Sequence, residues 1–171
     1  MTIIPEVFYE TKRKPSIVAP IIDPEEEIIG RQEKIHPFDY ERDNVKPGNE
    51  GKIFNTLCKF GVIICHDMVF PKVANILTKK GAQVLFSPSR IVRRGISPWQ
   101  MYVQVRALEN RIPILAANVE NHRFGRNSMI VDLIENNIVT TKITELSGEG
   151  KVIRFTLNKY EESRKRANFQ I

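Results

Sequence analysis

Cys65 is the residue whose type and position most directly suggest covalent chemistry. It ends the apolar run that starts at Gly61, which is typical of a buried strand, and Pro71 marks a helix start shortly after it. A thiol at the carboxyl end of a strand, near a helix N-terminus, can point into a cleft and have its pKa lowered. Taken alone, a free cysteine favours the simpler interpretation of a small apolar core residue, and Cys58 has only that interpretation.

Other residues with chemical potential lie in short motifs on both sides of Cys65. Lys34 precedes it by 31 positions and follows an apolar stretch that predicts a strand. Lysine is usually a solvated surface residue. Lys34 is a candidate site residue because of the motifs around it. In chain order these motifs are Gly30-Arg-Gln-Glu-Lys-Ile-His-Pro37, Pro47-Gly48, Phe60-Gly-Val-Ile-Ile-Cys-His-Asp-Met-Val-Phe-Pro71, Gly81-Ala82, Phe86-Ser-Pro-Ser89, Trp99, Arg106-Ala-Leu-Glu-Asn110 and Ala117-Asn118.

Taken in this order, the motifs resemble those of the nitrilase superfamily of carbon-nitrogen hydrolases. The family has a lysine motif, a nucleophile motif ICxD followed by FP, GA and PS signatures, and an RAxEN helix. The resemblance runs from about residue 3 to the C-terminus. It implies an α/β fold, the layered α-β-β-α sandwich of the family in one domain over residues 1–171. It also implies hydrolysis of non-peptide amide, N-carbamoyl or nitrile bonds through a Glu-Lys-Cys triad.

The resemblance assigns roles to individual residues. Cys65 is implied to be the nucleophile that forms a thioester, which splits one difficult hydrolysis into two easier steps. Lys34 supplies positive charge to the tetrahedral intermediate, and the backbone N–H of His66 is an oxyanion donor. Glu41, seven positions after Lys34, resembles a second glutamate that positions the lysine in many members. The alternative interpretation is that Glu41 is an exposed loop carboxylate beside Arg42.

Residues next to these motifs receive supporting roles. Arg106 and Glu109 belong to the helix motif, and the resemblance implies hydrogen bonds that support the site. Asp67 is interpreted as structural. The side chains of His36 and His66 lie beside motif positions, so neither is assigned to catalysis.

Arg90 is the candidate substrate-binding residue. It opens the segment Ser89 to Ser97, which also carries Arg93 and Arg94, after a predicted strand. In the sandwich that the resemblance implies, loops at that end border the active site. A guanidinium there could hold a substrate carboxylate in a bidentate pair. The alternative is a set of solvated arginines on a basic protein.

The N-terminal part departs from the family pattern. The resemblance places the catalytic glutamate, which acts as the general base, in a longer segment before the lysine motif. Pro5-Glu6 looks superficially like that motif, but Glu6 precedes Lys34 by only 28 positions, so Glu6 is expected to be a strand-edge residue. The chain could be a shortened gene product, a subunit completed by a partner chain, or a fragment whose true start lies before Met1.

The expected partners follow from that departure. A two-sheet sandwich that lacks strands has open edges and an uncovered apolar face. We therefore expect a homo-oligomer or a partner chain that supplies the missing segment. A catalytically inactive nitrilase-like protein that serves binding or subunit interaction is the alternative to an enzyme.

Short β-branched runs alternate with helical patterns along the chain, which indicates a layered α/β domain. A strand pair is expected around residues 8–24, before the lysine motif. One helix is predicted from about Pro71 to Gly81, and another begins near Ser97 with Trp99, Tyr102, Val103 and Ala107 on one face. The charged tail after Asn158 is predicted to be an arm, over residues 159–171, or disordered. The predicted strands are Ser16 to Ile22, Ile28 to Arg31, Phe60 to Cys65, Gln83 to Ser87, Ile112 to Asn118, Asn127 to Asp132, Ile138 to Ile143 and Val152 to Leu157.

The composition excludes several other classes of protein. With 171 residues, 42% of them hydrophobic, the chain can bury a core, and no apolar run approaches the roughly 20 residues that span a bilayer. Two cysteines and three scattered histidines predict no metal and no disulfide scaffold, and no cofactor is expected. The net charge of +6 is spread over several clusters, so no nucleic acid or membrane partner is predicted. The first ten residues lack a signal-peptide pattern, which predicts a cytoplasmic protein.

Overall fold

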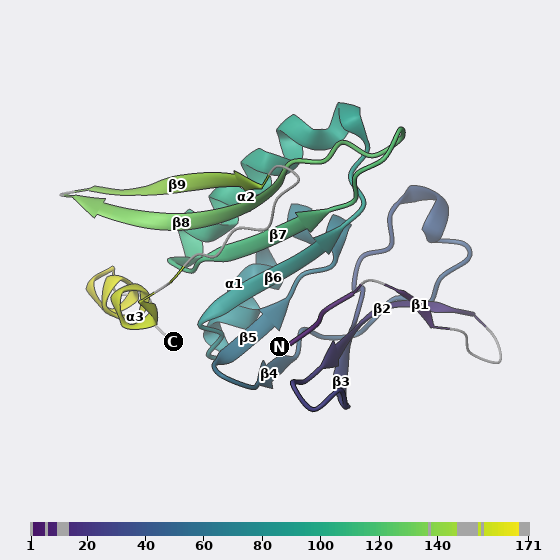
Figure 1. The fold of residues 1–171 in the computed structure, drawn as a ribbon, viewed down its shortest axis with the longest axis horizontal. Helices are drawn as coiled ribbons and strands as arrows, with labels where there is room; N and C mark the ends of the chain where they lie inside the picture. Colours follow the sequence, from purple (N-terminus) through teal and green to yellow (C-terminus); the bar gives the residue numbers. More distant parts are fainter. Residues whose placement is uncertain are drawn as a thin grey trace.

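Two β-sheets and the helices beside them make up the chain, as Figure 1 shows in a computed structural model that describes residues 2–5, 7–9, 14–136, 138–146, 154 and 156–167. In spatial order the larger sheet holds β4 (Ile53–Asn55), β5 (Lys59–Val62), β6 (Val84–Ser89), β7 (Ile114–Asn118), β8 (Ser128–Asn136) and β9 (Ile138–Leu146). Strands β5, β6 and β7 run parallel to one another, and all other neighbouring strands of this sheet pair antiparallel. The carboxyl ends of β5, β6 and β7 therefore lie at one edge of the sheet.

A smaller antiparallel sheet and a pair of helices cover the two faces of the larger sheet (Figure 1). The smaller sheet has the order β1 (Val7–Tyr9), β2 (Ser16–Ile22), β3 (Ile28–Glu33). The helices are α1 (Pro71–Lys79) and α2 (Ile96–Asn110). The layered α/β class that the sequence predicts is thus confirmed.

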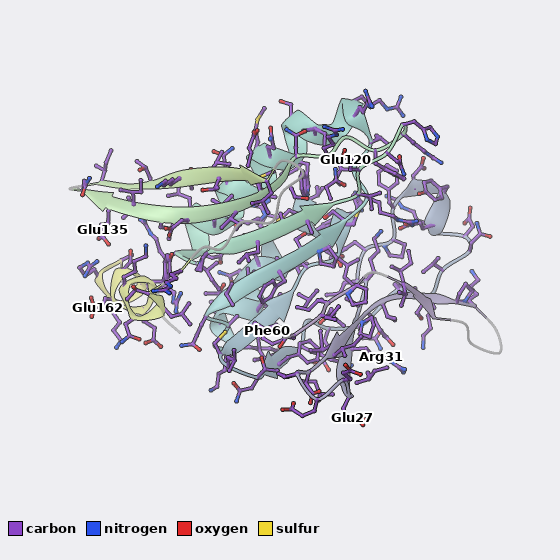
Figure 2. The ribbon with its side chains drawn as sticks, in the orientation of Figure 1. Glu27, Arg31, Phe60, Glu120, Glu135 and Glu162 are labelled. Atoms are coloured by element: carbon purple, nitrogen blue, oxygen red, sulfur yellow. The ribbon has the colours of Figure 1, made fainter. Side chains whose placement is uncertain are left out.

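The apolar run after Phe60 is buried because β5 and the residues that follow it face both layers. Phe60, Val62 and Ile64 pack with Ile17, Ala19 and Ile21 of the smaller sheet, and Figure 2 labels Phe60 between the two sheets. Ile63 points to the opposite face and packs with the helices. An apolar run buried on both faces is the pattern expected for a central parallel strand.

Most predicted elements are confirmed, with shifted ends. The predicted strand Phe60 to Cys65 stops at Val62, and Cys65 instead begins a short 3-10 helix, η2 (Cys65–Val69). On α2, Trp99, Val103 and Ala107 are buried as predicted, but Tyr102 is exposed. The short strand β4 carries no alternating pattern and was not predicted.

The tail, for which the sequence predicts an arm or disorder, contains a helix, α3 (Leu157–Arg166). Tyr160 is buried and its hydroxyl donates a hydrogen bond to Asp132 on β8; burial and this carboxylate raise the pKa of Tyr160. Arg164 Nη1 donates to the carbonyl of Arg111 at 2.9 Å. These tertiary contacts stabilise a helix whose sequence lacks an apolar stripe.

Two further predictions fall on residues outside the described part of the chain. Glu6 is one of them, and half of the predicted strand Val152 to Leu157, namely Val152, Ile153 and Phe155, is the other. Of the remaining positions, Arg154 and Thr156 lie in no strand and Leu157 begins α3. Within the described residues, no helix is long and apolar enough to cross a membrane. The same residues contain no cluster of three or more His, Cys, Asp and Glu side chains that could hold a metal ion.

Candidate active site

Cys65 stands at the point where β5 gives way to η2, at the carboxyl edge of the parallel strands. Its φ is 49°, in the left-handed region that non-glycine residues rarely adopt. The turn is fixed on both sides, because Ile63 N–H donates to Phe86 O at 2.8 Å and Asp67 N–H donates to Ile64 O at 3.0 Å. Backbone strain of this kind is concentrated at functional sites, and the Cys65 side chain is half-buried.

Lys34 and Glu41 form a buried ion pair. Lys34 follows β3, Glu41 lies in the 3-10 helix η1 (Asp39–Glu41), and Lys34 Nζ lies 2.7 Å from Glu41 Oε2. The side chains are only 1% and 5% exposed. Glu41 Oε2 also accepts the Phe38 N–H at 2.6 Å, so this carboxylate is fixed by two donors. The alternative of an exposed loop carboxylate for Glu41 is therefore wrong.

Asp67 joins the lysine segment to the Cys65 turn. Its carboxylate accepts hydrogen bonds from the backbone N–H groups of Ile35 at 3.1 Å and His36 at 2.7 Å, and it lies 2.9 Å from His36 Nδ1. Burial raises the pKa of Asp67 above its usual range, although these donors oppose the rise. Since Ile35 follows Lys34 directly and Asp67 is two residues from Cys65, one side chain holds the two motifs together.

Replacing Asp67 by Asn is expected to lower the free energy of unfolding by about 1.5–3 kcal/mol, the range for hydrogen bonds to charged groups. One of the two oxygens becomes an NH₂ group that faces a backbone donor. Urea denaturation measures the loss. Asp23→Asn is the matched control, because Asp23 also accepts two backbone N–H bonds, from Glu25 and Glu27, but in an exposed turn. Equal losses in the two variants would contradict the bridging role of Asp67.

Aromatic rings cover the face of the site beside His66. The His66 ring packs edge-on against Phe38 and Phe70, with centroid distances of 5.0 and 5.3 Å, and the His36 ring stacks on Phe70 at 3.7 Å. Burial lowers the pKa of His66 and is the largest effect. The hydrogen bond with His36 O opposes it, the positive charge of Lys34 lowers the pKa further, and the carboxylates of Asp67 and Glu41 have weaker raising effects. The imidazole of His66 is therefore neutral at pH 7.

This pKa predicts a pH dependence of stability. Since the folded-state pKa of His66 lies below that of the unfolded chain, near 6.5, the contribution of His66 is present above this pH and is lost as the pH falls through the folded pKa. Wild-type protein is expected to lose more stability than His66→Gln between pH 7 and pH 5, measured by urea denaturation. His122→Gln, an exposed histidine, is the control and should follow the wild type. A His66→Gln curve parallel to the wild-type curve would contradict this assignment.

Arg106 fixes the far end of the Cys65 turn from α2. Its guanidinium donates to the carbonyls of Met68 and Val69 at 3.2 and 3.1 Å, and to Glu109 Oε1 at 2.9 Å. The side chain is buried, so these bonds hold η2 against the helix. Arg106 and Glu109 thus occupy the supporting position that the resemblance implies.

The structure brings most of the predicted site residues into one region. Lys34 and Glu41 are in direct contact, Asp67 ties their segment to the turn of Cys65 and His66, and Arg90 lies exposed in the loop after β6, at the same edge of the sheet. Sequence reasoning missed the bridging role of Asp67. The only signal was a carboxylate placed two residues after a buried strand.

Comparison with known proteins gives consistent results from sequence and structure. A family model described as carbon-nitrogen hydrolase matches residues 1–141. A protein from Schizosaccharomyces pombe described as a probable nitrilase is 33% identical over 145 residues, which cover 82% of this chain and 52% of that protein. The chain thus spans about half the length of this relative.

Two solved structures share the fold. A carbon-nitrogen hydrolase from Helicobacter pylori superposes with a TM-score of 0.79 at 22% identity, covering 99% of this chain and 66% of the other. A mutant of the amidase from Nesterenkonia sp. AN1 superposes with a TM-score of 0.73 at 17% identity, covering 98% and 66%. In that amidase the acetamide moiety of fluoroacetamide is added covalently at the active-site cysteine.

Proposed function

This chain belongs to the carbon-nitrogen hydrolase family, the nitrilase superfamily, and from that premise we propose that it hydrolyses amide, N-carbamoyl or nitrile bonds through a thioester on Cys65. One observation carries the proposal: a cysteine with φ of 49° begins a turn that Asp67 ties to the buried Lys34–Glu41 pair. The covalent adduct at the cysteine of the Nesterenkonia amidase supports it by analogy.

Each residue has a defined part in the proposed reaction. With an amide or N-carbamoyl substrate, the thiolate of Cys65 attacks the carbonyl carbon, and the amine or ammonia leaves as the thioester forms. With a nitrile, the thiol adds to give a thioimidate, and one water molecule adds before ammonia leaves and the thioester remains. Negative charge that develops on the substrate oxygen is stabilised by the ammonium of Lys34 and the backbone N–H of His66. Water then hydrolyses the thioester and releases the acid.

Glu41 is proposed to position Lys34. Its Oε2 accepts hydrogen bonds from both Lys34 Nζ and the Phe38 N–H, so this oxygen is held as an acceptor that fixes the lysine side chain. The proton that leaves Cys65 and reaches the departing nitrogen needs another base. The family resemblance assigns this step to a glutamate that precedes the lysine in the chain.

Arg90 is the residue that we propose for substrate binding. Arg90 is proposed to contact the substrate, because it lies after β6 at the edge of the sheet where Cys65 stands.

We also propose that the chain acts as a homo-oligomer or with a partner chain. Exposed apolar side chains on the outer face of α2, Met101, Tyr102 and Val105, support such an association. Light scattering on the purified protein measures its molar mass. A monomer over the micromolar range would contradict the homo-oligomer and favour the partner chain.

The experiment that tests the proposed function measures two reaction products, ammonia and a hydroxamate. Wild-type protein is incubated with a short aliphatic amide, with and without hydroxylamine, which converts a thioester into a hydroxamate. Ammonia release together with hydroxamate formation is the expected result. Ammonia without hydroxamate would argue against a thioester, and the absence of both products would favour the inactive, nitrilase-like binding protein.

A further inference from the structure

Strand β9 forms one edge of the larger sheet, at the end opposite β4, as Figure 1 shows. Its residues pair with β8 in one continuous antiparallel register. In the described part of the chain β9 has no second strand neighbour, so the outward backbone N–H and C=O groups of residues 138–144 have no strand partner there. A row of such groups is a template for pairing with another strand.

The other sheet edges are protected in ways that β9 is not. β1 and β4 are only three residues long. β3 contains Gly30 and the charged Arg31 and Glu33, and its pairing with β2 includes a register shift. Short strands, charges and bulges are the means by which proteins block edge pairing. β9 is nine residues long and contains no proline or glycine, and its Ile138 and Ile143 side chains are 70% and 38% exposed.

Helix α2 holds one face of β9 in place. Gln100 Nε2 donates a hydrogen bond to Glu145 Oε1 at 3.2 Å, and Thr141 Oγ1 donates to Gln104 Oε1 at 3.4 Å. On the other side, β8 fixes the backbone of β9 over its whole length. The edge is therefore ordered before any partner binds, which lowers the entropic cost of association.

The sequence of β9 is self-complementary in one antiparallel register. When two copies of a strand pair about a two-fold axis, paired side chains share a face, so the axis passes through a residue that faces its own counterpart. With Thr141 on the axis, Val139 of each copy faces Ile143 of the other. In the same register, Thr140 of each copy faces Lys142 of the other. The seam thus has two apolar pairs on the α2 face and two uncharged-to-charged polar pairs on the opposite face, without like charges opposite each other.

The neighbouring registers are less favourable. With Lys142 on the axis, the two lysines face each other, and Val139 faces Glu145. With Thr140 on the axis, Ile138 faces Lys142. Like charges directly opposite each other destabilise a pair of strands, and apolar pairs stabilise it. The side chains of β9 therefore favour the register centred on Thr141.

We propose that β9 pairs with β9 of a second copy of this chain about a two-fold axis at Thr141, which joins two six-stranded sheets into one. A symmetric pair occupies the β9 edges of both copies, so the association closes as a dimer. The proposal names the contact surface of the homo-oligomer and rests on that part of the proposed function. It requires no chemistry at Cys65.

Light scattering over the micromolar range tests the proposal. Wild-type protein is expected to reach twice the chain mass of 19.7 kDa, and the concentration dependence gives the dissociation constant of the dimer. Thr140→Lys places an ammonium opposite Lys142 at two symmetric positions, so the dissociation constant should rise about fivefold or more. Thr140→Glu, at the same exposed position, creates attraction instead and should leave the dissociation constant at or below the wild-type value. Ile28→Lys, which adds the same positive charge on the edge strand β3, is the control and should stay within about twofold.

A second pair of variants tests the register. Val139→Lys places an ammonium against Ile143 of the second copy and should weaken the dimer about tenfold or more. Addition of Ile143→Glu to the same chain brings opposite charges together in the register centred on Thr141, and it should restore much of the lost affinity. Circular dichroism verifies the fold of each variant, and the exposed Thr140 variants give an independent answer if a substitution at Val139 or Ile143 prevents folding.

Four results would overturn the proposal. They are a monomeric wild type over the micromolar range, equal dissociation constants for Thr140→Lys and Thr140→Glu, a double variant no tighter than Val139→Lys, and an Ile28→Lys effect as large as that of Thr140→Lys. Ammonia and hydroxamate formation separates this proposal from the proposed reaction. A monomer that forms both products would overturn the β9 dimer alone, whereas a dimer with the expected β9 effects and neither product would count against hydrolysis alone.

Discussion

Replacing Lys34 by Met is expected to lower the free energy of unfolding by about 3–5 kcal/mol, the cost of leaving one buried charge without its partner. Lys34 and Glu41 are almost fully buried, and Glu41 would retain only the Phe38 N–H as a donor. Urea denaturation at pH 7 measures the change. The double variant Lys34→Met with Glu41→Gln should recover a large part of the loss, because it removes the unpaired carboxylate.

A surface ion pair provides the control for this prediction. Lys80 lies 3.1 Å from Glu50, but the two side chains are 41% and 61% exposed. Lys80→Met should therefore cost no more than about 1 kcal/mol. Equal losses for Lys34→Met and Lys80→Met, or a double variant as unstable as Lys34→Met, would show that burial of the Lys34–Glu41 pair has no energetic consequence.

If Cys65 is the nucleophile that we propose, its replacement by Ala removes the covalent route and is expected to reduce amide hydrolysis about a thousandfold or more. Stability should change by less than about 1 kcal/mol, because the side chain is small and half-buried. Ammonia release from a short amide measures the first effect and urea denaturation the second.

Cys58→Ala is the matched control for this substitution. Cys58 is also free and half-buried, and burial raises the pKa of its thiol, so it is expected to be an inert residue. Its replacement should leave turnover within about twofold of the wild type. Comparable losses for Cys58→Ala and Cys65→Ala would contradict the assignment of Cys65 as the nucleophile.

The elements of the core could be predicted because their patterns are local. β2 occupies the predicted residues, Ser16–Ile22, and α1 begins at the predicted Pro71, since β-branched runs and a first-turn proline specify these structures without distant contacts. The turn at Cys65 escaped prediction for the opposite reason. Ile63 and Ile64 continue the apolar run, but β5 already ends at Val62 and η2 begins at Cys65.

The contacts that assemble the site could not be predicted, because their partners are far apart in the sequence. Asp67 binds backbone groups of Ile35 and His36, 31 or more positions earlier, and Asn118 binds Ile91, 27 positions earlier. Backbone N–H donors carry no sequence signature. Helix α3 was missed because Tyr160 is its one large buried apolar side chain, and its docking depends on Asp132 of β8.

The central claim, that Cys65 is an activated nucleophile, is tested most directly by competitive alkylation of the two cysteines. The native protein is treated with limiting iodoacetamide at pH 7, and peptide mass spectrometry follows modification of Cys65 and Cys58 with time. The account predicts that Cys65 reacts faster by about tenfold or more, because Cys65 begins the turn that Asp67 ties to the Lys34 segment, whereas burial raises the pKa of Cys58. Equal rates at the two cysteines, or faster modification of Cys58, would contradict the claim.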